Sequence, residues 1–287
     1  ASHTLALARS VMNDKQVAEF ERTKECNFAI SPPGVGRFRV NAFIQQGKVG
    51  MVMRVIPAVL PTIDGLGVPQ VLKEIVMAKR GLCIMVGATG SGKSTTIASM
   101  ILHRAERRQE HVVTFEDPIE YHLPGVLQIP VNERKGLTFA KGLRSILRHD
   151  PDRIMVGEIR DSETAQIAVQ AALTGHQVFT TVHANNVFDV IGRFANMGVD
   201  TYSLVAALTG IMAQRLVRKL CKECKKPGVL DEMEIRALGL THDQVRDATV
   251  MTPVGCSNCR QNGFRGRLAI AEIFRMDDEV RTAINDN

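Results

Sequence analysis

Hydrophobic and polar residues follow two different patterns along this chain, and the first pattern ends near residue 56. Residues 37–44 alternate polar and apolar side chains, which is the pattern of a strand with one buried face. A similar strand is expected over 50–56, and helical spacing over 5–20 places Leu7, Val11 or Met12, and Phe20 on one face. Residues 1–56 therefore predict a small α+β domain.

Prolines and glycines punctuate the next stretch. Residues 57–69 have the composition of a linker, and apolar positions over 71–78 predict a short helix that stops at Gly81. We therefore assign 57–80 to a linker with a short helix.

From residue 81 onward the pattern changes to short, continuous apolar runs, separated by segments long enough to form helices. Continuous apolar runs are typical of parallel strands buried on both faces. Alternation of such strands with helices predicts an α/β domain over 81–287, with helices on both sides of a mainly parallel sheet. The expected strands are 82–86, 112–115, 153–157 and 177–182.

The first of these strands leads into the pattern G-x-x-x-x-G-K-[ST], which binds the phosphates of nucleotides. Glycines allow its N–H groups to approach a phosphate, Lys93 supplies a point charge, and the Ser94 hydroxyl can bind Mg²⁺. A surface turn rich in glycine and serine is the alternative, but the expected strand and the helix over 96–108 favour a nucleotide site. The residues are Gly87, Ala88, Thr89, Gly90, Ser91, Gly92, Lys93, Ser94 and Thr95.

Polar clusters follow the next three strands or flank them, at 116–120, 157–161 and 174–183. Ligands of parallel sheets bind at the carboxyl ends of strands, where a carboxylate can hold Mg²⁺ or orient water. Taken singly, Glu120 or Glu158 could be an ion-pair partner or a helix-start acid; the three clusters together favour catalysis. His176 and His183 are seven residues apart, so at least one should lie outside its strand.

Four cysteines form two C-x2-C pairs, Cys221 with Cys224 and Cys256 with Cys259. This arrangement suits a closed structural zinc site, with disulfides or an iron–sulfur cluster as the alternatives. A reducing compartment disfavours disulfides. Between the pairs we expect a hairpin of two helices, with Asp231 and Glu234 opening one and Thr241 and Gln244 capping the other.

The amino-acid composition limits the classes of partner that this chain is expected to bind. Net charge is +6, and the main cationic cluster lies between residues 215 and 226. The absence of tryptophan and the presence of only two tyrosines disfavour stacking on single-stranded nucleic acid, so no nucleic-acid partner is expected. No apolar stretch reaches the ~18 residues of a membrane span, and no signal peptide is visible.

These motifs, in this order, resemble the motor ATPases of type IV pili and type II secretion systems. The resemblance rests on the phosphate loop, the acidic box 116–120, the Walker B segment 154–158 with Gly157 in the usual place of Asp, and the histidine box 174–183. It implies a RecA-like P-loop NTPase core with a small N-terminal PAS-like α+β domain, here expected to be truncated, and with a cysteine insertion at 221–259.

The family resemblance also implies roles for individual residues. Glu120 would be the catalytic carboxylate and Glu158 the Mg²⁺-associated one, while His176 and His183 would lie near the γ-phosphate or an interdomain contact. Four arginines look like those that reach the nucleotide across domains: Arg39, Arg54, Arg144 and Arg148.

The implied activity is hydrolysis of ATP to ADP and phosphate, coupled to mechanical work in a cytoplasmic homo-hexamer on an inner-membrane platform protein. Residues 13–16 and 36–56 resemble the retraction ATPases PilT and PilU, whereas 136–140, 143–161 and 214–224 resemble the assembly and secretion ATPases PilB and GspE. We favour assembly or secretion, with retraction as the alternative. A zinc-containing nucleic-acid translocase and a nucleotide-gated component with little turnover are more distant alternatives.

Overall fold

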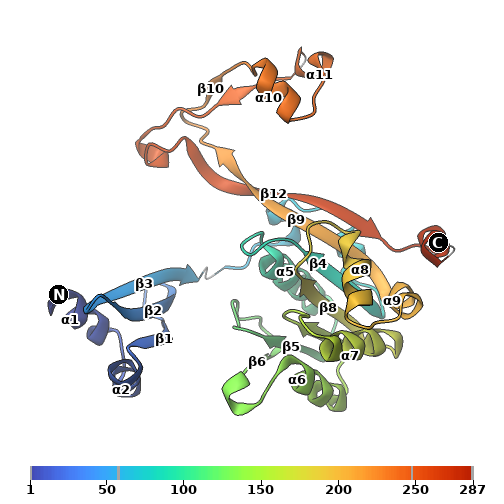
Figure 1. Cartoon of the computed structure of the whole chain (residues 1–287), viewed down its shortest axis with the longest axis horizontal. Helices are drawn as coiled ribbons and strands as arrows, with labels where there is room; N and C mark the ends of the chain where they lie inside the picture. Colours follow the sequence, from blue (N-terminus) through green and yellow to red (C-terminus); the bar gives the residue numbers. More distant parts are fainter. Residues whose placement is uncertain (1, 57–58, 247, 286–287) are drawn as a thin grey trace.

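The computed structural model describes residues 2–56, 59–246 and 248–285. Figure 1 shows a small N-terminal domain, a larger core built on a sheet, and a two-stranded ribbon that leaves the core and ends in a small separate region.

The N-terminal domain is an antiparallel sheet with two helices beside it. Its elements are α1 (Ser2–Ser10), α2 (Asp14–Thr23), β1 (Glu25–Ile30), β2 (Arg37–Gln45) and β3 (Lys48–Ile56), with β2 in the middle of the sheet. Both strands predicted from the sequence are confirmed. The single helix expected over 5–20 is wrong, because the Asn13 side chain accepts the N–H of Gln16 and starts a second helix there. Leu7, expected on the apolar face, is 47% exposed, while Phe20 is buried.

The core sheet is parallel except at one edge. Its strands are β4 (Gly81–Val86), β5 (Val112–Glu116), β6 (Leu127–Pro130), β7 (Arg153–Val156), β8 (Gln177–Val182), β9 (Leu208–Leu220) and β12 (Phe264–Arg275). They lie in the order β12-β9-β4-β8-β7-β5-β6, and only β12 runs antiparallel to its neighbour. The four predicted strands are confirmed as β4, β5, β7 and β8.

Helices cover both faces of this sheet, as predicted. One face packs against α3 (Ile63–Leu66), α4 (Leu72–Val76) and α5 (Lys93–Ala105). The other packs against α6 (Phe139–Ile146), α7 (Ser162–Leu173), α8 (Asp189–Asn196) and α9 (Thr201–Ala207), with α12 (Asp278–Asn285) beside α9. The core also contains two 3-10 helices, η1 (Glu133–Lys135) and η2 (Leu147–His149).

Strand β4 explains why the buried strands are continuously apolar. Ile84 and its two even-numbered neighbours belong to one hydrophobic cluster, while Cys83 and Met85 belong to the other. All six residues of the strand are buried. Because each face of the strand meets a helical layer, neither alternate set of side chains can be polar.

The segment assigned to a linker is more ordered than its composition suggests. Residues 57 and 58 lie outside the described residues, but Ile63, Leu72 and Val76 of α3 and α4 are at most 1% exposed in the core. Gly81 does not stop the short helix; it is the first residue of β4, with φ +124°. A Cβ there would lie 2.3 Å from the Thr209 side chain, which explains the glycine.

A buried ionic cluster lies at the amino end of the parallel strands. Glu110 accepts hydrogen bonds from Arg104 and from Arg153, at 2.6 and 3.0 Å. Both arginines also donate to backbone carbonyls just before β4, Arg104 to Val76 and Arg153 to Lys79. The cluster therefore fastens the chain that enters the core to the ends of α5 and β7.

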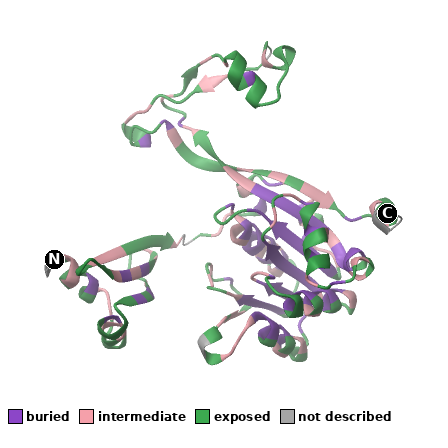
Figure 2. Ribbon diagram, viewed as in Figure 1, coloured by how far each residue is buried: buried purple, intermediate pink, exposed green. Residues whose placement is uncertain are grey.

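Strands β9 and β12 continue beyond the sheet as the projecting ribbon (Figure 1). Figure 2 shows the change from buried to exposed residues along it. β9 is largely buried as far as Gln214 and exposed from Val217 to Lys219. The end region contains β10 (Lys226–Pro227), α10 (Glu232–Ala237), α11 (His242–Arg246), β11 (Met251–Thr252) and η3 (Ser257–Cys259).

The two short helices predicted between the cysteine pairs are confirmed. The Asp231 side chain accepts the N–H of Glu234 at the start of α10, and Thr241 accepts that of Gln244 before α11. Gly239, with φ +66°, follows α10.

Candidate functional site

The phosphate loop lies between β4 and α5, at the carboxyl edge of the sheet. The helix begins at Lys93, after Gly92 with φ +93° and no side-chain cap, so its first N–H groups remain available to an anion. A Cβ at Gly87 would lie 2.5 Å from the Gln214 carbonyl oxygen. Glycine at 87 and 92 is therefore required by close packing and by the positive φ.

Gln214 of β9 supports this loop from behind, and the sequence analysis gave it no role in the site. The side chain is 2% exposed; Nε2 donates to the Ser91 carbonyl at 2.9 Å, and Oε1 accepts from the Thr96 hydroxyl at 2.9 Å. A buried amide whose donor and acceptor are both used fixes the two groups that it joins. The available signal was a glutamine at the end of an otherwise apolar run.

Lys93 points back over the loop. Its Nζ donates to the carbonyl oxygens of Gly87 at 2.7 Å and Ala88 at 3.1 Å. Burial lowers the pKa of Lys93, and the Glu158 carboxylate acts in the opposite direction. The ammonium group is thus held where the phosphates of a nucleotide would lie.

The predicted carboxylates converge beside Lys93. A cavity of roughly 170 Å³ is lined by Lys93, Ser94, Glu120, Glu158 and His183, together with neighbouring residues of the loop and of the strand ends. The Glu158 side chain is 13% exposed, pairs with Arg160, and lies 3.6 Å from His183 Nε2. Glu120 is exposed at the mouth of this cavity.

The neighbouring strand accounts for Gly157 in the Walker B segment. A Cβ at this position would lie 3.2 Å from the Phe115 carbonyl oxygen and 3.4 Å from the Phe139 ring. The Gly157 N–H donates to that same carbonyl at 2.8 Å. A side chain there would need the Phe115 carbonyl to give way by a few tenths of an ångström, which favours glycine over the usual first acid of the motif.

The two histidines of the histidine box lie at opposite ends of β8. His183 follows the strand and lines the cavity, whereas His176 precedes it, and its Nδ1 contacts the Ala171 carbonyl at 3.1 Å. Within its own chain, His176 therefore lies away from the phosphate loop, because the whole length of β8 separates it from that edge; the alternative, a place at an interdomain contact, stays a prediction. Both histidines are outside the strand.

The four predicted arginines likewise fall into two groups, one that lines a cavity at the site and one that does not. Arg39 and Arg54 face each other across β2 and β3 and line a cavity of roughly 700 Å³ together with Thr95, Glu120 and other loop residues. Arg144 instead pairs with Glu163 at 2.5 Å, between α6 and α7, and Arg148 is exposed on η2. The structure thus brings the first two to the site and leaves Arg144 and Arg148 outside these two cavities.

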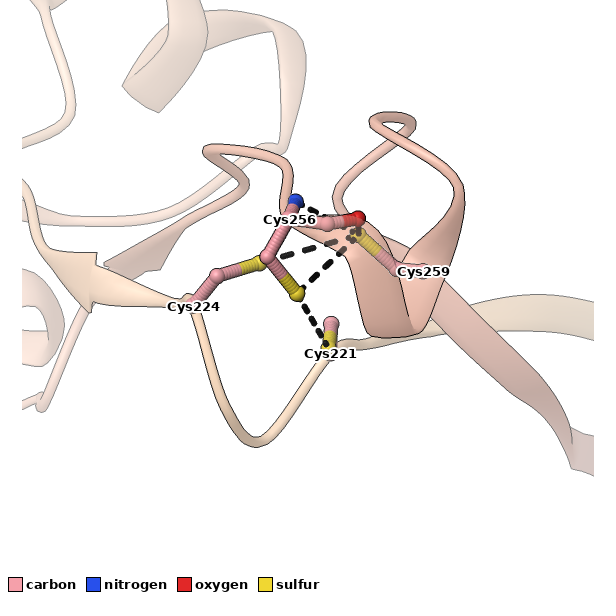
Figure 3. Close-up of side chains that lie close together, drawn as sticks. All are labelled: Cys221, Cys224, Cys256 and Cys259. Atoms are coloured by element: carbon pink, nitrogen blue, oxygen red, sulfur yellow. Dashed lines mark hydrogen bonds between the residues drawn. The ribbon is translucent and has the colours of Figure 1, made fainter.

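The four cysteine sulfurs gather at the base of the end region (Figure 3). They lie within 4.8 Å of one another, with Sγ–Sγ distances of 3.9 Å for Cys221–Cys256 and 3.8 Å for Cys224–Cys259. Ligands about 2.3 Å from a tetrahedral ion are about 3.8 Å apart, whereas disulfide sulfurs are about 2.05 Å apart. The cluster therefore suits one ion, and the cysteines are free rather than disulfide-bonded.

Backbone donors surround these sulfurs. Cys259 Sγ accepts N–H groups from Cys256 at 3.1 Å and Gly263 at 3.2 Å, and Cys224 Sγ accepts that of Gly255 at 3.3 Å. Burial raises the pKa of Cys259, but hydrogen bonds from the Cys256 and Gly263 N–H groups and from neighbouring thiols lower it to about 6. The Gly255 N–H lowers the pKa of Cys224, but burial and the neighbouring thiols raise it to about 11. A thiolate is the form of cysteine that binds a metal.

A phosphate loop between a buried parallel strand and a helix, with carboxylates from the neighbouring strand ends, defines a P-loop nucleotide-binding protein. Residues 25–287 match the model of the family described as Type II/IV secretion system protein, and the chain belongs to that family. The resemblance inferred from the motifs is confirmed.

Named relatives are consistent with this family. The chain is 46% identical over 229 residues to the type IV pilus assembly ATPase PilB of Thermus thermophilus, covering 78% of this chain and 26% of that protein. It is 46% identical over 216 residues to type II secretion system protein E of Aeromonas hydrophila, covering 75% of this chain and 42% of the relative. The chain thus spans less than half the length of these curated relatives.

Solved structures share the fold over almost the whole chain. The pilus retraction motor PilT with bound ADP superposes with a TM-score of 0.75 at 34% identity, covering 99% of this chain and 73% of that one. The ATPase DotB of Legionella pneumophila gives 0.70 at 25% identity, covering 98% and 70%. The mixed α/β fold with a predominantly parallel sheet is therefore that of known ATPases.

Proposed function

We propose that this chain is the catalytic part of a motor ATPase, which hydrolyses ATP to ADP and phosphate and converts the reaction into motion between its two domains. The observation that carries this is the convergence of Lys93, Ser94, Glu120 and Glu158 on one cavity. PilB and the secretion protein E relatives have this same core, at 43–46% identity.

Each residue of the cavity has a distinct task. Lys93 and the loop N–H groups bind the β- and γ-phosphates, and Ser94 with Glu158 would hold Mg²⁺, which neutralises charge on the phosphates when bound. Glu120 orients or deprotonates the attacking water. His183, next to Glu158, lies where it can sense the γ-phosphate.

Charge from elsewhere completes the site. Arg39 and Arg54 stabilise the phosphoryl-transfer transition state from the N-terminal domain, a role supported by the cavity that they share with the loop. Arg144, Arg148 and His176 are proposed to act on a neighbouring subunit, since they lie away from the site of their own chain.

The assembly that we propose is a homo-hexamer at the cytoplasmic side of the inner membrane, docked on a platform protein of the pilus or secretion machine. No helix in the described ranges is both long and apolar enough to cross a bilayer. Over comparable shares of this chain, 92% and 99%, identity to a type II secretion system protein E (43%) exceeds identity to the PilT structure (34%), which favours assembly or secretion over retraction.

The cysteine cluster is proposed to bind one structural Zn²⁺. Four thiols at tetrahedral spacing are a closed ligand set with no position left for substrate.

Two alternatives to the motor ATPase can be tested by measuring hydrolysis. Stimulation of ATP hydrolysis by DNA would favour the nucleic-acid translocase, and a negligible steady-state rate would favour a nucleotide-gated component.

Substitution of Glu120 tests the proposed chemistry. Glu120→Gln should lower ATP turnover by about 10²–10⁴-fold with nearly unchanged ATP binding, because it removes the base but keeps the side-chain shape. Lys93→Ala should instead weaken ATP binding itself, because it removes a charge from the phosphates. Glu106→Gln, an exposed acid at the end of α5, is the control. Hydrolysis at the wild-type rate by Glu120→Gln would contradict the assignment and move the role to Glu158.

A further inference from the structure

Glu120 lies on the loop between β5 and β6, and that loop, rather than Glu120 itself, is anchored. Among the described residues no hydrogen bond holds the Glu120 carboxylate, and the residue is exposed at the junction of the two cavities. A catalytic carboxylate must nevertheless be held within a fraction of an ångström of its productive position. Its position must therefore be set by the residues that fix the loop.

Gln128 of β6 holds the backbone of this loop. Its Nε2 donates to the Tyr121 carbonyl at 2.8 Å and to Glu116 Oε1 at 3.0 Å, while its Oε1 accepts the Leu123 N–H at 2.8 Å. Both donors and the acceptor of the amide are used, so the side chain has one orientation. The loop is thus closed over Gln128 directly after Glu120.

Glu116 serves this same network. Its Oε1 accepts the Thr114 hydroxyl at 2.5 Å as well as the Gln128 amide, so this oxygen is engaged in holding the loop. The two glutamates of the acidic box therefore have different surroundings: Glu116 is tied down, and Glu120 is available to a substrate.

A second anchor joins the loop to the phosphate-binding helix. The Tyr121 hydroxyl lies 2.9 Å from Thr95 Oγ1. Thr95 is in the first turn of α5, next to Ser94, and both Tyr121 and Thr95 line the larger cavity. The Tyr121 ring also packs against the cluster that contains the buried Leu123.

We infer that Tyr121, through its bond to Thr95, is a positioning residue for Glu120, with Gln128 fixing the backbone on which both residues lie. The inference rests on the proposed function. The two neighbouring hydroxyl groups of α5 then have different roles. Ser94 faces the nucleotide, and Thr95 holds the loop that carries Glu120. A movement of the first turn of α5 is passed to Glu120 through a single hydrogen bond.

Tyr121→Phe in the purified full chain removes the hydroxyl and keeps the ring in its packing. We expect kcat for ATP to fall about 3- to 10-fold, the range of one neutral hydrogen bond, while Kd for ADP changes by less than about twofold. A purely structural role would lower the melting temperature without this separation of kcat from binding.

Substitutions of Thr95, the hydrogen-bond partner of Tyr121, give a second test. Thr95→Ser keeps the hydroxyl and should retain most of kcat, whereas Thr95→Val in the Tyr121→Phe background should lower kcat little further than Tyr121→Phe alone, because the shared bond is already lost. Gln128→Glu keeps the shape but removes the amide donors facing Glu116 and the Tyr121 carbonyl. It should lower kcat at least as far as Tyr121→Phe.

Glu120→Gln in the same assay separates the two ideas. If it is inactive while Tyr121→Phe turns over at the wild-type rate, the positioning inference is wrong and the proposed function stands. Independent, multiplicative effects of the Tyr121 and Thr95 variants would also overturn the inference. If Glu120→Gln keeps the wild-type rate, the catalytic role of Glu120 and the inference fall together.

Discussion

Glu110 connects two buried arginines that would otherwise carry unpaired charge. The Arg104 hydrogen bonds, followed by the charge of Arg153, hold the pKa of Glu110 below its usual range. A carboxyl group with a lowered native pKa contributes stability above its unfolded pKa of about 4.3, and this contribution is lost as pH falls through the native value.

Glu110→Gln should therefore destabilise the chain by about 3–5 kcal/mol at pH 7, because it leaves the two buried arginine side chains without the carboxylate that balances their charge. The difference from wild type should begin to shrink as pH falls below about 4.3, where the carboxyl protonates in the unfolded chain, and should be smallest below the lowered native pKa. Urea denaturation at both pH values measures this, with Glu106→Gln as the exposed control. A loss that is equal at both pH values would show that packing, not charge, is responsible.

Among single residues, the phosphate loop was predictable because its chemistry depends on neighbouring positions. Gln214 was not, since its partners Thr96 and Ser91 lie 118 and 123 residues away. Tyr121 was missed for a related reason: its contact with Thr95 depends on how two elements pack, and no spacing encodes it. His176 and His183 show the reverse case, where the histidine box of the family resemblance grouped two residues that β8 holds at opposite ends.

Helix α6 packs unusually close to β5, because Gly142 faces the ring of Phe115. A Cβ at Gly142 would lie 2.3 Å from this ring, which is fully buried and packs edge-on against Phe139 at 5.6 Å. Gly142→Ala should thus cost about 1–3 kcal/mol through overpacking, measured by chemical denaturation.

Gly192 of α8 is the matched helical glycine with open space around it. Gly192→Ala should stabilise the chain by roughly 0.5–1 kcal/mol, since alanine is the better helix former. If both variants shifted stability in the same direction, helix propensity rather than packing would govern the Gly142 position.

The end region of the ribbon depends on its cysteines, because α10 and α11 are short. Isolated helices below about 12–15 residues are marginal in water, and α10 has Ile235 as its buried residue. We expect metal analysis to find one zinc per chain. Cys256→Ser, or a chelator, should speed amide hydrogen exchange over 221–263 and lower thermal stability before it affects ATP hydrolysis.

Exchange in β4 and β8 should stay unchanged, because their core does not contact the cluster. A metal-free chain with slow exchange throughout 221–263 would contradict the zinc assignment.

At the level of elements, the strands β4, β5, β7 and β8 were predictable because a strand buried on both faces is continuously apolar. The ribbon was not predicted, because β9 begins in an apolar run and ends in a basic cluster, so no single period describes it. The division between α1 and α2 depends on one cap at Asn13, which an apolar stripe does not reveal.

For the molecule as a whole, activity should depend on the N-terminal domain. Arg39→Ala or Arg54→Ala should lower kcat at saturating ATP by about 10-fold or more, as loss of a transition-state charge does, with little change in melting temperature. Arg22→Ala, an exposed arginine of α2, is the control. Steady-state kinetics that show equal losses for all three variants would indicate a general charge effect instead.

The position of Gln214 within β9 has a mechanical consequence. The same strand that supports the phosphate loop runs without interruption to Leu220, directly before Cys221. Cys221 is seven residues beyond Gln214 in the sequence, or about 23 Å along an extended strand. A tilt of about ten degrees at the loop would therefore displace the cysteine cluster by about 4 Å on this strand length. One strand thus connects the residue that supports the phosphate loop to the cysteine cluster.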